Sequence, residues 1–176
     1  MHLRTDSYEH IKITAINTLE YYDIKCVPIS AFEMANKIGL SVIPYSAFGE
    51  KAELLMKQSE DGFIVGKSIY YNNKCKNYGR INQTIMHEIG HYILGHKANG
   101  EEEESEAKFF AKYTLAPPPL IHKMLDNPTI EDIADLFDIS YTAASNALNY
   151  YQKWRYYGGL DFTPYEQKLL RLFNVA

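Results

Sequence analysis

The chain has 176 residues, of which 46% are hydrophobic and 23% charged, and it carries a net charge of −4 at pH 7. This length and composition allow a full buried core without help from disulfides, so we expect one compact unit of two lobes. Because the net charge is negative, the chain has no general attraction for phosphate backbones or anionic lipids. We therefore expect neither a membrane nor a nucleic acid as a direct partner.

The sequence shows no sign of export. Residues 1–10 lack the apolar region of a signal peptide, and no later run reaches the roughly 18 apolar residues of a membrane-spanning helix. Cys26 and Cys75 are far apart and lack a C-x-x-C spacing, which suits reduced thiols better than a disulfide framework. We predict a soluble cytoplasmic protein.

The N-terminal part of the sequence predicts two helices. Apolar residues recur at intervals of three and four over residues 7–22, which is typical of an amphipathic helix. Ser30, followed three residues later by Glu33, forms a capping box for a second, shorter helix. Gly39 is a typical residue to end that helix.

Residues 40–71 predict a small antiparallel sheet. Runs of apolar or β-branched residues at 40–43, 53–57, 62–65 and 68–71 are separated by Gly, Pro and Asn. We interpret the last run as an edge strand that could hold an extended peptide by main-chain hydrogen bonds, although an edge strand without a ligand fits equally well. The polar residues 74–81 predict a loop.

The stretch that carries chemistry is residues 84–96, which reads TIMHEIGHYILGH. On a helix, His87 and His91 lie on one face, so both imidazoles can bind one metal ion. Glu88 lies beside them and can take a proton from a water molecule at the metal. The apolar pattern around them and the stop at Gly95 favour a helix and argue against a chance match. We therefore predict zinc ligands at His87 and His91 and a catalytic base at Glu88.

A catalytic zinc site needs a third protein ligand and an open position for water. The next helix is expected over residues 101–115, with four glutamates in its first turn, and prolines at 117–119 should end it. Its apolar face, traced back by three and four residues, reaches Glu104 and Glu103, while Glu106 lies about a quarter turn away. Glu104 is the first choice for the ligand, and Glu103 and Glu106 remain alternatives.

His96 would be a ligand in the related pattern H-E-x-x-H-x-x-G-x-x-H. Here Gly95 follows His91 by four residues instead of three, and His96 follows by five instead of six. We therefore interpret His96 as a residue at the helix C-terminus that the helix dipole favours.

Residues 129–155 have the outline of a helix-turn-helix, with two amphipathic helices separated by a turn at 138–140. Acidic residues outnumber basic ones there, and the second helix has no arginine placed to read bases. We interpret it as a support or partner-docking unit instead of a DNA reader. After a hinge at 158–159, Thr163 and Glu166 cap a last helix that packs on the protein or binds a partner, packing being the commoner outcome.

With these motifs in place, the sequence resembles the ImmA/IrrE family of zinc metallo-endopeptidases over about residues 30–149. The most specific parts are HEIGHYILGH at 87–96 and ESEAKFFA at 104–111, which is similar to the family's E-x-x-A-N-x-F-A stretch and is followed by a proline. Lys108 stands where the family usually has Asn, and Gln83 stands where it usually has Phe. Lys108 would lie near the metal ligands.

The resemblance implies zinc ligands at His87, His91 and Glu104 and a catalytic base at Glu88. Such proteins are typically encoded in bacteria and their mobile elements. The resemblance implies that they relieve repression by cutting a helix-turn-helix repressor, often encoded nearby, after DNA damage or another stress.

We therefore predict an α+β, zincin-like fold. A metallopeptidase core at 1–119 would pack a small antiparallel sheet on the H-E-x-x-H helix, and a helical subdomain would follow at 120–176. The predicted function is a zinc-dependent endopeptidase that acts on a regulatory protein. One alternative is a non-catalytic zinc-containing regulator that binds a partner protein or DNA, and another is a zinc enzyme that acts on a non-peptide amide. The oxyanion-stabilising residue is not identified, because several of the 15 tyrosines could reach the site.

Overall fold

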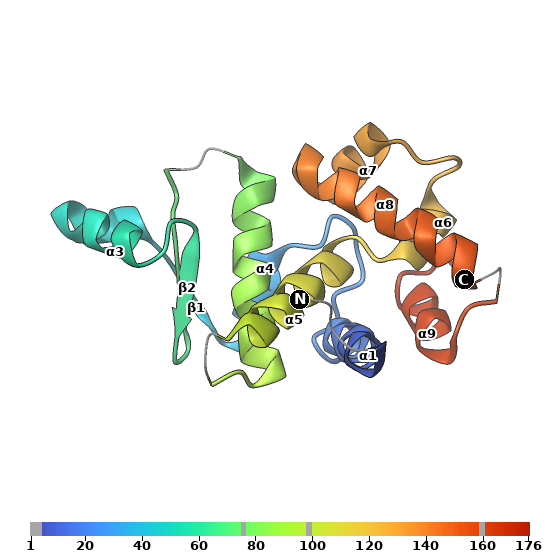
Figure 1. Cartoon of the computed structure of the whole chain (residues 1–176), viewed down its shortest axis with the longest axis horizontal. Coiled ribbons are helices and arrows are strands. Elements are labelled where there is room, and N and C mark those ends of the chain that lie inside the picture. Colours follow the sequence, from blue (N-terminus) through green and yellow to red (C-terminus); the bar gives the residue numbers. More distant parts are fainter. Residues whose placement is uncertain (1–4, 75–76, 98–99, 159–160) are drawn as a thin grey trace.

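The computed structural model describes residues 5–74, 77–97, 100–158 and 161–176 of the chain. Helices make up most of it, and a small sheet lies between α3 and α4 (Figure 1), so the α+β class is confirmed. In chain order the elements are α1 (Thr5–Tyr21), α2 (Ala31–Ile38), β1 (Ser41–Pro44), the 3-10 helix η1 (Tyr45–Lys51), α3 (Ala52–Gln58), β2 (Gly62–Val65), β3 (Ser68–Tyr71), α4 (Tyr78–Leu94), α5 (Glu101–Leu115), α6 (Pro118–Met124), α7 (Ile130–Phe137), α8 (Tyr141–Gly158) and α9 (Pro164–Leu172).

Several helix ends lie where the sequence predicts them. The Ser30 side chain accepts a hydrogen bond from the backbone N–H of Glu33, and Gly39 ends α2 with a φ of 84°. Helices α7 and α9 begin with complete capping boxes at Thr129 and Thr163. These boundaries depend on residues three or four apart, which is why the sequence encodes them locally.

The sheet differs from the predicted antiparallel arrangement. Its strand order is β1-β3-β2, with β1 parallel to β3 and β2 antiparallel to β3. β2 and β3 form a hairpin whose turn contains Gly66 at a φ of 60°. The long connection through η1 and α3 allows β1 to pair in parallel. The Ser68–Tyr71 strand is therefore central and not the edge that the sequence predicts, and β2 is the edge strand that contacts α4.

Two local predictions are also wrong, and a third is confirmed. Residues 53–57, predicted as part of the sheet, lie in α3, whose sequence AELLMKQ consists of good helix formers. The predicted loop at 74–81 is too long, because α4 begins at Tyr78 behind the Asn77 cap. The predicted end of α5 at the prolines is confirmed, because this helix ends at Leu115. Two of the three prolines also begin α6, since proline is tolerated in the first helical turn.

Some predictions concern residues that the structure does not describe. Cys26 has a free, exposed thiol, while Cys75 and Gly159 lie outside the described residues. Within the described part of the chain, no helix is both long and apolar enough to cross a membrane.

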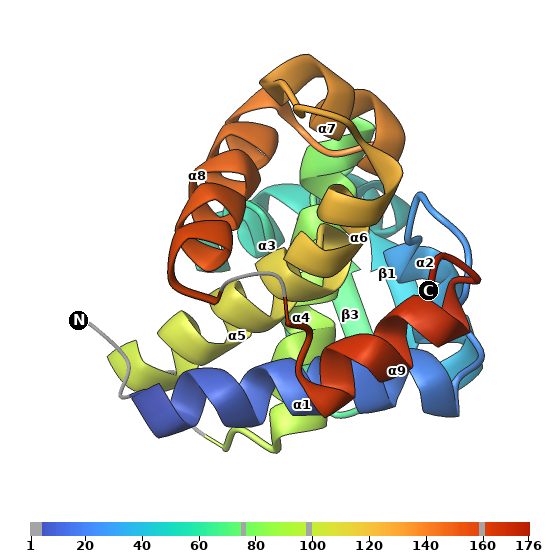
Figure 2. The ribbon, with the colours of Figure 1, turned by 90° about the vertical axis from the view of Figure 1, so that its right-hand side faces the viewer.

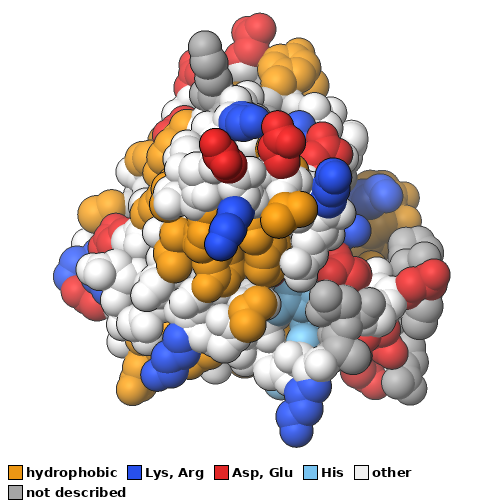
Figure 3. All heavy atoms as spheres, turned by 90° about the vertical axis from the view of Figure 1, so that its left-hand side faces the viewer, with side chains coloured by type: hydrophobic (Ala, Val, Ile, Leu, Met, Phe, Trp, Pro, Cys, Tyr) orange, Lys and Arg blue, Asp and Glu red, His pale blue; other side chains and the backbone are white. Residues whose placement is uncertain are grey.

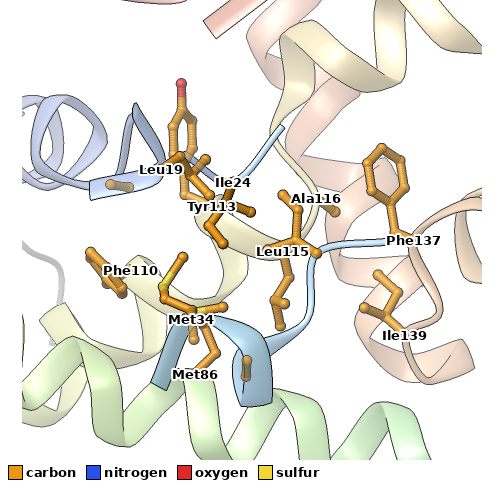
Figure 4. Close-up of a cluster of buried hydrophobic side chains, with 14 of the residues drawn as sticks. Leu19, Ile24, Met34, Met86, Phe110, Tyr113, Leu115, Ala116, Phe137 and Ile139 are labelled. Carbon is orange, nitrogen blue, oxygen red and sulfur yellow. The ribbon is translucent and has the colours of Figure 1, made fainter. Parts of the chain in front are cut away.

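One buried hydrophobic cluster connects the early and late helices. Side chains of α1, α2, α4 and α5 face one another, and Leu115 lies between that group and Phe137 of α7 (Figure 4). Helix α9 packs beside α1 (Figure 2) and buries Leu169 and Leu170, so the last helix packs on the protein. The cluster is continuous past residue 119 and includes buried side chains from both sides of that position. The division into a core at 1–119 and a subdomain at 120–176 stays a prediction.

The start of α4 touches the turn between α7 and α8 at Gly79. A Cβ on Gly79 would lie 2.6 Å from the backbone nitrogen of Ser140 and 2.8 Å from the carbonyl carbon of Ile139. Backbone atoms cannot rotate away as a side chain can, so a Cβ there must push the two elements apart. This close approach fixes α4 against the C-terminal helices.

We expect Gly79→Ala to lower the free energy of unfolding by about 1–3 kcal/mol, the usual cost of overpacking, despite the better helix propensity of alanine. Urea denaturation measures this change. Gly158→Ala is the matched control, because a Cβ there meets only the indole nitrogen of Trp154 at 4.0 Å, and it should leave stability unchanged or slightly raised. Wild-type stability in Gly79→Ala would contradict the contact.

Candidate metal centre

Helix α4 holds His87, Glu88 and His91 within two turns, as the H-E-x-x-H pattern predicts. The helix begins at the Asn77 cap and ends at Gly95, whose φ of 73° turns the chain back so that N–H groups reach the last carbonyls. Glu88 and His91 are buried, and His87 is partly buried. All three side chains therefore project from a rigid helix whose two ends are capped.

Helix α5 approaches α4 closely at Gly90. A Cβ on Gly90 would lie 3.1 Å from the Phe110 ring and 3.3 Å from the Cα of Ala107. Two small residues, Gly90 and Ala107, thus face each other where the helices meet. Glu104 lies one turn before Ala107 on the same side of α5. The close approach therefore brings the Glu104 carboxylate to the two histidines.

The polar atoms of these three side chains converge on one point. Nε2 of His87 and Nε2 of His91 are 3.1 Å apart. One carboxylate oxygen of Glu104 lies 3.4 Å from Nε2 of His87, and the other lies 3.3 Å from Nε2 of His91. Zinc bonds of about 2.0–2.1 Å at tetrahedral angles separate neighbouring ligand atoms by about 3.3–3.4 Å. The described residues thus contain a group of the size and chemistry that zinc requires, with two imidazoles and one carboxylate.

Burial keeps both imidazoles neutral. The pKa of His87 is lowered to about 4, first by burial and then by repulsion from His91. The pKa of His91 is also lowered, again chiefly by burial, although the Glu104 carboxylate opposes the shift. A neutral imidazole offers the lone pair that a metal ion needs, so these side chains are ready to bind at pH 7 without losing a proton.

Glu88 lines the same cleft as His87 and Glu104 but does not belong to the converging group. Burial and the nearby charge of Glu104 raise the pKa of Glu88 to about 7, while a hydrogen bond from the backbone N–H of Ile64 acts in the opposite direction. A carboxylate with a raised pKa is a stronger base than an exposed one. The site therefore offers a base beside the ligand group.

His96 and Glu106 lie behind the converging group. Nδ1 of His96 is 2.9 Å from Nδ1 of His91, and Nε2 of His96 is 3.1 Å from a carboxylate oxygen of Glu106. Both residues, like Glu103, are absent from the metal-binding group that the described residues form. Among the described residues, Glu104 is thus the one of the three glutamates that lies together with the two histidines, and its role as a ligand stays a prediction. The interpretation of His96 as a helix-end residue misses its contact with His91.

The cleft beside the converging group has a volume of about 700 Å³. One wall comes from the start of β2 and from Asp61, which is paired with Arg80 at 2.6 Å. The opposite wall comes from Ser140 and Thr142 at the α7–α8 turn, so the helix-turn-helix-like unit forms part of the cleft. On the face seen in Figure 3, histidine is visible only as small areas between other side chains, in keeping with the partial burial of the site.

None of the described residues that line the cleft is a tyrosine, so the expected oxyanion-stabilising tyrosine is not identified there. Lys108, which stands at the Asn position of the family motif, does line the cleft, and its Nζ lies 3.9 Å from a Glu104 oxygen. Its side chain is mostly exposed, so this ion pair adds little to stability.

Comparison with known protein families matches residues 36–149 to the Peptidase_M78 model, described as an IrrE N-terminal-like domain. The chain belongs to this family. The match confirms the resemblance to the ImmA/IrrE proteins, and it includes both α4 and α5 with their converging side chains. No curated protein and no solved structure matches the chain significantly. Membership of the Peptidase_M78 family supports a metallopeptidase type of function.

We expect the wild-type protein to bind about one zinc ion per chain and Glu104→Ala to lose most of it, because two imidazoles alone hold zinc weakly. Elemental analysis after dialysis against trace zinc measures the content. Glu102→Ala is the matched control, since it removes an exposed glutamate from the same helical turn. Full zinc content in Glu104→Ala would show that this carboxylate is not a ligand.

Proposed function

We propose that the protein is a zinc-dependent endopeptidase that cuts a regulatory protein, a helix-turn-helix repressor. The observation that carries this proposal is the convergence of His87, His91 and Glu104 within 3.1–3.4 Å, with Glu88 beside them in one cleft. The Peptidase_M78 match supports the peptidase chemistry. The resemblance to ImmA/IrrE proteins supports the choice of a repressor, and with it a role in a stress response or a mobile element.

In this proposal the three converging side chains hold the zinc ion and Glu88 moves the proton. When bound, zinc lowers the pKa of a water molecule and polarises the scissile carbonyl. Glu88 accepts a proton from the water molecule while the oxygen of that water attacks the carbonyl carbon. Glu88 then gives that proton to the amine nitrogen as the C–N bond breaks, so one water is consumed for each bond that is cut.

The substrate segment is proposed to lie along the cleft between β2 and the α7–α8 turn. β2 is the edge strand here, but its backbone is partly engaged within the protein. The Ser59 hydroxyl donates to the carbonyl of Gly62 at 2.6 Å and accepts from its N–H at 3.2 Å, and Ile64 donates to Glu88. A peptide that adds to this edge must displace these contacts, so side-chain binding in the cleft carries more of its affinity.

A smaller cavity of about 290 Å³ adjoins the cleft at Gln83 and Lys108, which line both. Its floor is apolar and includes Leu115, Ile139 and Ala143. This size and lining suit an apolar side chain of the substrate next to the bond that is cut.

We expect Glu88→Gln to lower kcat by about 100- to 10,000-fold, because glutamine keeps the shape of the side chain but cannot accept the proton. Zinc content should stay at the wild-type level, since Glu88 lies outside the ligand group. Mass spectrometry of purified repressors encoded beside the gene, incubated with each variant, measures the cleavage.

Glu102→Gln serves as the control, because it makes the same chemical change at an exposed position on α5. Repressor cleavage by zinc-loaded Glu88→Gln at the wild-type rate would contradict the proposed base. An unchanged biological effect of Glu88→Gln in cells would favour the alternative, a zinc-containing regulator that acts by binding.

A further inference from the structure

His91, His96 and Glu106 form a chain of contacts that leads away from the metal-binding group. The ring of His91 offers Nε2 to the converging group and Nδ1 to Nδ1 of His96 at 2.9 Å. The other ring nitrogen of His96, Nε2, lies 3.1 Å from the Glu106 carboxylate. Nδ1 of His91 and both ring nitrogens of His96 therefore each have one defined neighbour in this chain of contacts.

The backbone places His96 where this chain needs it. Gly95 ends α4 in the left-handed conformation, and the N–H of His96 then donates to the carbonyl of His91 at 3.1 Å. This turn folds the His96 side chain back onto the ring of His91. The His96 side chain is only 7% exposed and that of Glu106 is 23% exposed, so water competes little for their contacts.

With a neutral His96 and an ionised Glu106, the hydrogen-bond chemistry of the three groups allows one consistent arrangement. An ionised carboxylate only accepts hydrogen bonds, so Glu106 requires the hydrogen of His96 on Nε2. Nδ1 of a neutral His96 is then an acceptor, which requires the hydrogen of His91 on Nδ1. Nε2 of His91 is left with a free lone pair that faces His87 and Glu104. If His96 donated to His91 instead, the hydrogen of His91 would sit on Nε2 and block the metal.

We propose that Glu106 and His96 are positioning residues, which fix the tautomer and the ring orientation of His91 for metal binding. The inference rests on the zinc site of the proposed function and adds two residues to it. Hydrogen-bond partners behind a ligating histidine typically contribute 10- to 100-fold to metal affinity. The role differs from that of the ligands, because neither side chain belongs to the metal-binding group of the described residues.

The first experiment measures zinc affinity by competition with a chelator of known affinity. We expect Glu106→Leu to weaken zinc binding by about 10- to 100-fold, because leucine cannot accept the hydrogen of His96. Glu106→Gln should retain most of the affinity, because its amide oxygen can still accept. Glu102→Leu makes the same change at an exposed position of α5 and should bind zinc as the wild type does.

The second experiment reads the tautomers directly. Nitrogen-15 NMR of the histidine rings, recorded with and without zinc, should place the hydrogen of His96 on Nε2 and that of His91 on Nδ1 in the wild type and in Glu106→Gln. In Glu106→Leu the His96 assignment should be lost or mixed. Far-ultraviolet circular dichroism of each variant establishes that the fold is intact, which separates a positioning role from a loss of structure.

Three outcomes would overturn the inference. The first is zinc affinity in Glu106→Leu within two- to threefold of the wild type. The second is an equal loss in Glu106→Gln and Glu106→Leu, which would assign the effect to charge and not to the accepted hydrogen bond. The third is a wild-type His96 with its hydrogen on Nδ1. A wild type that binds no zinc but has the expected tautomers would instead contradict the proposed function alone.

Discussion

The site depends first on how closely α4 and α5 approach each other. Gly90 lies within the metal-binding motif itself, and a Cβ there would lie 3.3 Å from the Cα of Ala107. A larger residue at either position would widen the gap between the helices, because packed cores relieve such contacts by moving backbone. The third candidate ligand comes from α5, so the separation of the helices decides whether Glu104 reaches the histidines. Gly90 thus has a structural role between the two histidines that the H-E-x-x-H pattern does not require.

Burial and charge then give the same group its chemical character. The two histidines are held neutral by burial, whereas the adjacent Glu88 has its pKa raised to about 7 by burial and by Glu104. The same low-polarity environment therefore has two effects. It leaves the imidazoles with lone pairs that can bind a cation, and it increases the affinity of the Glu88 carboxylate for protons. Beyond the histidines, the α7–α8 turn lines the cleft, so a unit with the outline of a DNA-binding motif contributes to the cleft beside the candidate metal centre.

The sequence predicts the parts of the site that depend on local geometry. His87 and His91 are four residues apart on one helix, and the helix face that carries Ala107 leads directly to Glu104. The order of strands could not be predicted in the same way, because β1 and β3 pair across more than twenty intervening residues. A short apolar run such as residues 53–57 is compatible with a strand or a helix. These residues are good helix formers, and they lie in α3.

The contact between His96 and Glu106 could not be predicted from the sequence either, since it depends on how α5 packs against the end of α4. A histidine directly after a helix-ending glycine was the one available signal. That position is compatible with a solvated helix end as well as with a contact to the preceding turn, and only the packing of α5 on α4 distinguishes them.

The proposed function requires that this protein cuts peptide bonds in a regulator with Glu88 as the base. All protein N-termini can be compared in host cells that express the wild type or Glu88→Gln, using mass spectrometry of labelled termini. We expect at least one new internal N-terminus, within a helix-turn-helix repressor, that appears with the wild type and is absent with Glu88→Gln. Identical sets of N-termini in the two cultures, under conditions where both proteins are present and loaded with zinc, would contradict it.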